Sequence, residues 1–161
     1  MKVPSDFGVD DADFVNVTVP SDLRKLREPE ARIMTELKRC GYDQDTVFAI
    51  KLAFEEAVTN AVKHGNANDR SKLIHLRYYV DPQRVVLMVR DEGPGFHPDG
   101  VPDPTADENL ERPSGRGLML MHSYMTKVLY SQAGNEVWLL KESPSAPGTG
   151  TSSRDANSNV G

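Results

Sequence analysis

A change of periodicity in the middle of the chain restricts its possible folds more than any other feature. Residues 43–64 carry apolar side chains at helical spacing, whereas residues 72–80 and 84–91 are β-rich runs. The two runs are separated only by the turn sequence at 81–83. Strands joined by so short a connection pair antiparallel. The centre of the chain therefore predicts a helix followed by a β-hairpin.

The N-terminal part predicts one strand and one interrupted helix. Residues 13–20 alternate apolar and polar, which is typical of a half-buried strand. Residues 21–41 then follow a helical pattern that ends at a glycine. Because Pro29 lies inside that pattern, we expect a break or kink near Glu28.

The C-terminal part adds a long loop, a helix and a second hairpin. Residues 92–115 have loop composition, and residues 116–125 follow a helical pattern. Two further β-rich runs, 127–131 and 136–141, flank the turn signal Gly134-Asn135. A loop as long as 92–115 inside a compact domain is typical of a lid or a disordered insert.

This order of elements predicts the α+β class. Strands come in pairs and helices in a group, which differs from the βαβ alternation of a Rossmann fold. We expect a two-layer sandwich in which helices cover one face of a mixed, mostly antiparallel sheet. The domain should span residues 13–142, after a flexible N-terminus at 1–12. Residues 143–161 are rich in Ser, Gly, Asn, Pro and Thr and predict a disordered tail.

Composition and charge exclude several functional classes. The net charge is −5, whereas a nucleic-acid surface needs clustered Lys and Arg. No apolar run reaches the roughly 18 residues of a membrane span, and the first residues lack the apolar core of a signal peptide. Cys40 is the single cysteine, which excludes an internal disulfide and a cysteine-based zinc site. The chain is therefore predicted to be cytoplasmic.

The first candidate site lies on the helix at 43–64. Glu56, Asn60 and His64 are four residues apart and share one helical stripe. Alone, this pattern favours a solvated polar face. The surrounding Ala and Val residues, however, predict partial burial, and buried polar groups need partners. An asparagine oxygen suits Mg²⁺, and a glutamate can accept a proton. Zinc is disfavoured, because the other histidines are scattered along the chain.

The second candidate is the sequence DEGPGF at 91–96, directly after the second hairpin strand. Gly93 and Gly95 allow a ligand to approach the backbone closely. Asp91 can accept a hydrogen bond from the amino group of a base. The same residues also make an ordinary turn, so the motif is weak by itself.

The third candidate is SGRGLML at 114–120. Gly115 and Gly117 precede a predicted helix, whose bare N–H groups and dipole favour an anion. Arg112 and Arg116 add charge suited to phosphate. The segment matches neither a P-loop nor a Rossmann glycine pattern. A flexible hinge is the alternative interpretation.

Together, the three motifs resemble the N, G1 and G2 boxes of the GHKL (Bergerat-fold) ATPases and kinases. The resemblance runs from about Phe14 to Lys141. Within that superfamily, the chain is most similar to the bacterial anti-sigma-factor serine/threonine kinases. Their N box, Glu-Ala-x-Thr-Asn-Ala-x-x-His, matches EAVTNAVKH at 56–64 at every specified position.

This resemblance implies a site for ATP and Mg²⁺. Asn60 would ligate the Mg²⁺, Glu56 would be the general base, and Asp91 would accept a hydrogen bond from the adenine amino group. The other implied positions are Gly93 and Gly95 at the adenine pocket, Gly115 and Gly117 at the lid hinge, and Arg112 or Arg116 beside the phosphates.

The implied function is an ATP-dependent serine/threonine kinase that binds a sigma factor and phosphorylates a STAS-type antagonist. The resemblance also implies a homodimer. Two alternatives stay open. An ATP-ordered binding switch would not need Glu56. The catalytic subunit of a split histidine kinase would need a second chain to carry the phosphoacceptor, because residues 1–42 contain no histidine.

Overall fold

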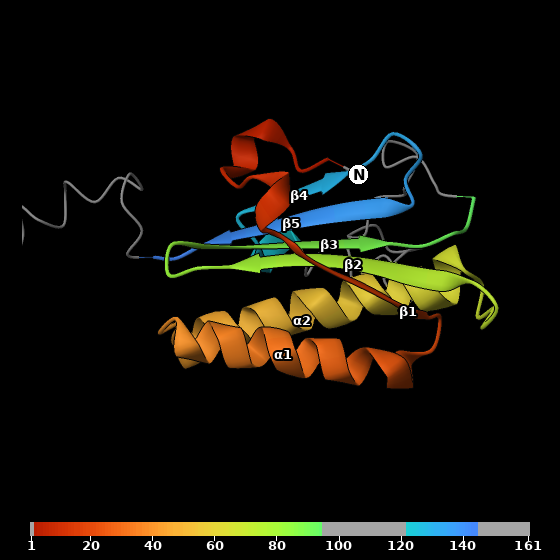
Figure 1. Cartoon of the computed structure of the whole chain (residues 1–161), viewed down its shortest axis with the longest axis horizontal. Helices are drawn as coiled ribbons and strands as arrows, with labels where there is room; N and C mark the ends of the chain where they lie inside the picture. The colour runs from red at the N-terminus through yellow and green to blue at the C-terminus, as the bar shows by residue number, and fades with distance from the viewer. Residues whose placement is uncertain (1, 95–121, 145–161) are drawn as a thin grey trace, which may run out of the picture.

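The computed structural model describes residues 2–94 and 122–144, which form a helical layer packed on an antiparallel sheet (Figure 1). The sheet has five strands in the order β1-β2-β3-β5-β4. The strands are β1 (Val15–Pro20), β2 (Leu73–Val80), β3 (Arg84–Arg90), β4 (Lys127–Tyr130) and β5 (Glu136–Glu142). The predicted α+β class is confirmed. Every described strand pair is antiparallel, so these strands form no mixed sheet.

Both predicted hairpins are present. β2 and β3 are joined by a turn in which the Asp81 carboxylate accepts hydrogen bonds from the Gln83 and Arg84 amides at 2.7 and 2.8 Å. The β4–β5 turn contains Gly134 with a φ angle of 80°, which is a left-handed conformation that favours glycine. Turn chemistry therefore sets the register of both hairpins.

The first helical region is interrupted, as Pro29 predicted. Asp22 caps a short 3-10 helix, η3 (Leu23–Leu26), and α1 (Arg27–Arg39) starts directly after it. Pro29 therefore lies in the first turn of α1, where its missing N–H leaves no helical hydrogen bond unmade. The change from 3-10 to α winding falls just before Glu28, where the sequence predicted a break or kink, and the backbone stays helical through it.

The second helix, α2 (Gln44–Asn60), begins at Asp43, whose carboxylate accepts a hydrogen bond from the Thr46 amide at 2.8 Å. It continues as one π-helical turn, η4 (Ala61–Gly65), closed by the Asn66 amide on the Ala61 carbonyl at 2.8 Å. The helix thus ends where the sequence predicted. A π turn ends it, and the left-handed residues after it are Ala67 and Asn68, with φ angles of 52° and 61°.

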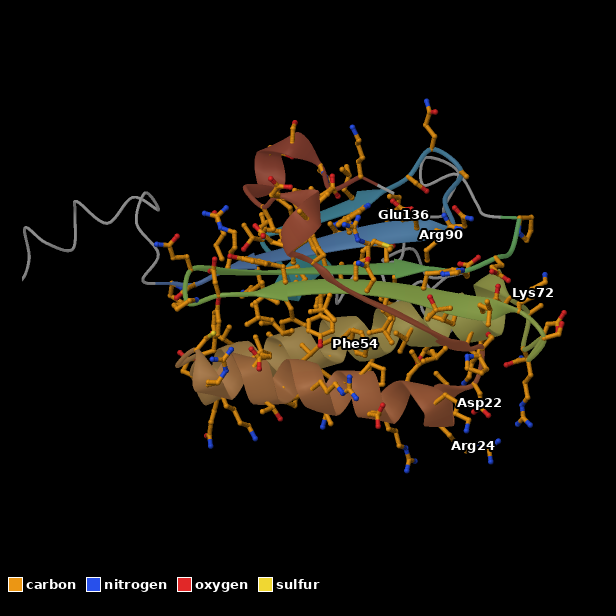
Figure 2. All side chains as sticks on the ribbon, viewed as in Figure 1. Asp22, Arg24, Phe54, Lys72, Arg90 and Glu136 are labelled. Atoms are coloured by element: carbon orange, nitrogen blue, oxygen red, sulfur yellow. The ribbon has the colours of Figure 1, made fainter. Side chains whose placement is uncertain are left out.

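The main core lies between the helices and the inner face of the sheet. Phe54 extends from α2 toward the strands (Figure 2) and is 1% exposed. Fully buried side chains come from both layers, namely Ile33, Leu37, Ile50, Phe54, Ile74, Leu76, Leu87 and Leu139. Strands β3 and β5 are buried on both faces, because a second cluster covers the outer face of the sheet.

This outer-face cluster is built by the N-terminal segment, residues 3–14. The segment lies across the sheet from α1 and α2 (Figure 1) and contains the 3-10 turns η1 (Ser5–Phe7) and η2 (Asp11–Asp13). The rings of Phe7 and Phe14 meet Trp138 edge to face at centroid distances of 6.5 and 5.8 Å. The sequence predicted a flexible segment at 1–12, because these residues are rich in Asp. In the structure Phe7 is 1% exposed.

The segment is also held by charged side chains. The Arg77 guanidinium lies 4.6 Å from the centre of the Phe14 ring and donates to the Asp11 carboxylate at 3.0 Å. Arg84 donates to the Phe7 carbonyl, also at 3.0 Å. Residues 2–14 therefore belong to the folded unit.

Several predicted segments lie outside the described residues, among them most of the lid, most of the helix at 116–125 and residues 145–161 of the tail. Within the described residues, no helix is both long and apolar enough to cross a membrane.

Candidate active site

Helix α2 presents Glu56 and Asn60 one turn apart, and both side chains are half-buried. The surrounding small residues bury them, as the sequence predicted: Ala57 and Ala61 are 3% and 5% exposed. His64 falls in the π turn, which holds more residues than an α turn, and it is exposed. Of the three residues on the predicted stripe, only Glu56 and Asn60 are therefore half-buried on α2.

Glu56 is a stronger proton acceptor than a surface glutamate. Burial raises its pKa, and the neighbouring Glu55 carboxylate raises it further, whereas Lys63 lowers it. A raised carboxyl pKa suits a general base, because the driving force for taking a proton increases with basicity. The position that the motif assigns to proton transfer thus has the electrostatics that this role needs.

The end of this helix meets the end of β3 at a very close contact. A Cβ atom on Gly65 would lie 2.2 Å from an Asp91 carboxylate oxygen, and one on Gly93 would lie 1.8 Å from the Gly65 carbonyl oxygen. A larger residue at Gly65 would displace the Asp91 carboxylate, and a larger residue at Gly93 would need a backbone shift. Glycine at both positions permits the helix of the first motif to lie against the turn of the second.

Asp91 is buried and held by its neighbours. Its backbone N–H donates to the Asn135 carbonyl at 2.9 Å, and its carboxylate accepts from the Gly93 N–H at 2.8 Å. The residue is 8% exposed, and burial raises its pKa while the Gly93 hydrogen bond lowers it. A buried carboxylate is stabilised by an N–H donor. The site is therefore suited to a ligand that carries an amino group.

Two cationic side chains lie at this end of the sheet. Figure 2 shows Lys72 just before β2 and Arg90 at the end of β3 on the same side of the molecule. Both lower the pKa of Asp91, and so they favour its ionised form. The carboxylate and the two cations make the region suitable for a ligand with both donor groups and negative charge.

The described residues suit Mg²⁺ better than a metal held by protein alone. Across residues 2–94 and 122–144, no group of three or more His, Cys, Asp or Glu side chains could hold a metal ion. Mg²⁺ commonly takes one or two protein oxygens and completes its shell with water and substrate phosphates. The half-buried Asn60 amide on α2 is such an oxygen donor.

Five predicted site residues cannot be placed, because Gly95, Arg112, Gly115, Arg116 and Gly117 lie outside the described residues. Their roles stay predictions. The structure does bring the N-box helix together with Asp91 and Gly93.

Two site residues were missed by the sequence interpretation. Gly65 was interpreted as a helix end, and Asn135 as part of a turn. Each local interpretation fully explains why its residue is present. The contacts of Gly65 and Asn135 with Asp91 are visible only in three dimensions.

Two proteins of similar sequence are named serine-protein kinases. The serine-protein kinase RsbW of Bacillus subtilis (strain 168) is 30% identical over 125 residues, which are 73% of this chain and 77% of that protein. The serine-protein kinase RsbW of Staphylococcus aureus (strain JH9) is 27% identical over 137 residues, 80% of this chain and 86% of that protein.

A solved structure shows the same fold. The crystal structure of the RsbU and RsbW domains of Rv1364c from Mycobacterium tuberculosis aligns with a TM-score of 0.55 at 19% identity. The alignment covers 83% of this chain and 33% of that longer chain. Residues 19–141 match the histidine kinase-like ATPase domain family. Together with the N-box helix and the Asp91 turn, this match shows that the chain belongs to the histidine kinase-like (GHKL) ATPase family, in which it is similar to serine-protein kinases.

Proposed function

We propose that this protein is an ATP- and Mg²⁺-dependent protein serine/threonine kinase that acts as an anti-sigma factor. It would bind a sigma factor and phosphorylate a STAS-type antagonist of the same pathway. The observation that carries the kinase is Glu56, a half-buried carboxylate of raised pKa, one helical turn from Asn60. The similarity of this chain to proteins named serine-protein kinases supports an acceptor protein that is phosphorylated on a hydroxyl group.

In this proposal Glu56 is the general base. As the serine or threonine oxygen forms its bond to the γ-phosphorus of ATP, the bond to ADP breaks and the hydroxyl proton moves to Glu56. Bound Mg²⁺ would neutralise charge on the phosphates, with Asn60 supplying one oxygen ligand. Positioning and charge neutralisation are the main requirements of phosphoryl transfer.

Asp91 would recognise the adenine ring of ATP. Its buried carboxylate would accept a hydrogen bond from the adenine amino group, and Gly65 and Gly93 would let the helix end lie against the turn that carries this carboxylate. A homodimer and a cytoplasmic location belong to the same proposal, carried by family likeness.

The decisive test is E56Q in the full chain. We expect phosphate transfer from labelled ATP to the cognate STAS protein to fall at least about 100-fold, while calorimetry finds ATP affinity within about twofold. The glutamine keeps the size of the side chain and removes its basicity. Undiminished transfer by E56Q would show that another group is the base.

The same assay separates the alternatives. The binding switch predicts that wild-type protein binds ATP and captures the sigma factor in a nucleotide-dependent way but transfers no phosphate to any STAS protein. A histidine kinase subunit predicts a phosphorylated product that is labile in acid, whereas phosphoserine survives acid. An acid-stable product and competition between sigma factor and STAS protein are the outcomes expected here.

A further inference from the structure

Asn66 is a polar residue with no exposed surface, and it lies just beyond the N-box motif. Its backbone N–H closes the π turn on the Ala61 carbonyl at 2.8 Å, and its carbonyl accepts from the Asp69 amide at 3.0 Å. A buried asparagine is costly unless its amide is fully bonded. The partners of that amide therefore indicate why the residue is there.

The side chain of Asn66 joins three separate segments. Its amide nitrogen donates to the Ser21 hydroxyl and to the Leu73 carbonyl, both at 3.1 Å. Its amide oxygen accepts from the Glu92 N–H at 2.8 Å. Only an amide of this length provides two donors and one acceptor from a single short side chain. Aspartate lacks the donors, and alanine lacks all three groups.

The bond to Glu92 matters because this N–H belongs to the peptide unit that follows Asp91. The carbonyl of the same peptide accepts from the Asn135 side chain at 3.3 Å. The 91–92 peptide is thus held on one side by Asn66 and on the other by Asn135. A peptide unit is planar, so holding its two ends fixes the ψ angle of Asp91.

The other backbone angle of Asp91 is restrained by its own N–H, which donates to the Asn135 carbonyl. With φ and ψ both restrained, the direction of the Asp91 Cα–Cβ bond is set. A carboxylate that recognises a base must be aimed as well as buried, because hydrogen bonds weaken steeply with misalignment. Asn66 follows the last turn of the helix and supplies one of these restraints, the hydrogen bond to the Glu92 N–H.

We propose that Asn66 is a positioning residue for base recognition: through the 91–92 peptide it aims the Asp91 carboxylate at the ligand's exocyclic amino group. This inference rests on the proposed function, in which Asp91 binds the adenine amino group. Asn66 touches no part of the nucleotide in this proposal and acts only through Asp91.

The test compares ATP with inosine triphosphate, which carries an oxygen in place of the 6-amino group. Both affinities are measured by calorimetry on the full chain and on N66A. We expect the preference of N66A for ATP to fall about tenfold, the usual effect of losing a well-aligned hydrogen bond. The ratio of the two affinities is informative, because partial unfolding lowers both equally.

Two further substitutions keep the test interpretable. N66S leaves a hydroxyl in the buried site and too short a side chain for the Glu92 N–H, so it should show the same fall even if N66A does not fold. N66D keeps an oxygen that can accept from Glu92, and its preference for ATP should lie closer to that of the wild type. A ratio for N66D no better than that for N66A would overturn the assignment to the Glu92 bond.

Y42F is the matched control. It removes one hydrogen bond, from the Tyr42 hydroxyl to the Asp81 carbonyl at 2.7 Å, at the opposite end of the β2–β3 hairpin from Asp91. It should lower stability and leave the nucleotide ratio unchanged. A fall in the ratio for Y42F equal to that of N66A would mean that general loosening causes both.

D91N separates this inference from the function on which it rests. If D91N keeps the full preference for ATP, then Asp91 does not read the amino group and the proposed site fails. If D91N loses the preference while N66A and N66S keep it, the site stands and the role of Asn66 is wrong. Loss in all three variants supports both.

Discussion

At the scale of single residues, two glycines let the two motifs touch. A side chain on Gly93 would meet the Gly65 carbonyl, and a side chain on Gly65 would meet the Asp91 carboxylate. Glycine is required here by space, since the helix end must approach the turn at backbone distance. The proposed nucleotide site therefore depends on two residues that contribute no functional group.

G65A tests this requirement. The new methyl group would lie 2.2 Å from an Asp91 oxygen, so Asp91 must move and the affinity for ATP should fall at least about tenfold, as expected when a buried hydrogen bond to the ligand is lost.

G41N is the control, because a Cβ atom at Gly41 meets nothing within 4 Å and asparagine tolerates its φ angle of 86°. Calorimetry with ATP should find the control unchanged. A normal affinity in G65A would show that the contact is not needed.

Sequence patterns found only part of this site. Glu56 and Asn60 stand out because they are polar residues among small apolar ones on one helical stripe, and burial in the structure agrees with that. Gly65, Asn66 and Asn135 do not stand out, because each already has a local explanation in a helix end or a turn. Their roles come from contacts between segments distant in sequence, which no local pattern can encode.

At the scale of elements, the contact between α1 and α2 contains a pair of carboxyl groups. Burial raises the pKa of Glu30 from 4.5 to about 7, and a side-chain hydrogen bond to Glu55 and its charge add to the effect, whereas Lys51 opposes it. Glu55 is in turn the neighbour that raises the pKa of Glu56. The helix contact is therefore sensitive to pH near neutrality.

The sign of that dependence follows from linkage. Because the pKa of Glu30 is higher in the folded state, the folded state holds more protons between pH 4.5 and about 7. Stability should therefore fall as pH rises through that window. E30Q removes the ionisation and should raise the free energy of unfolding at pH 8 by about 1 kcal/mol, a value reduced for solvent screening because Glu30 is only half-buried.

Urea unfolding at pH 5 and pH 8 measures this effect. E28Q removes an exposed carboxylate from the same helix and is the control for the loss of one negative charge. Equal stabilisation of E30Q at both values of pH would contradict a role for ionisation.

Helices and strands followed from periodicity, with one instructive exception. The pattern predicted where α2 ends, but the π turn at Ala61–Gly65 was not predicted. Side chains in a π turn are compatible with an α pattern over so few residues. Contact with the end of β3 accompanies the change in winding, since Gly65 must reach Asp91.

At the scale of the whole molecule, the sheet is covered on both faces, although the sequence predicted helices on one. The second cover is the N-terminal segment, and Phe7 is its most buried residue. Its burial depends on Trp138, which is distant in sequence and lies on the outer face of β5. Composition alone therefore suggested a flexible segment.

The F7A substitution measures how much the N-terminal segment contributes to the free energy of unfolding. Removing a buried phenylalanine side chain should lower the free energy of unfolding by about 3 kcal/mol. ATP affinity of the folded protein should persist, because the site is built by α2 and the end of β3. F48A is the control: Phe48 is 59% exposed, and its loss should change stability by less than about 0.5 kcal/mol. Equal stability of the two variants in urea would show that the segment is not part of the folded unit.

The outer-face cluster also imposes an order on folding during synthesis. Residues up to 90 contain α1, α2 and β1 to β3, so the inner core can begin to form as soon as they emerge from the ribosome. Phe7 emerges early, yet its partner Trp138 is made only near the end of the folded domain. Strand β5 turns Leu139 toward the inner core and Trp138 toward the outer cluster. We therefore expect the N-terminal segment to make its first contacts with β2 and β3, and the outer-face cluster to be complete only when β5 emerges.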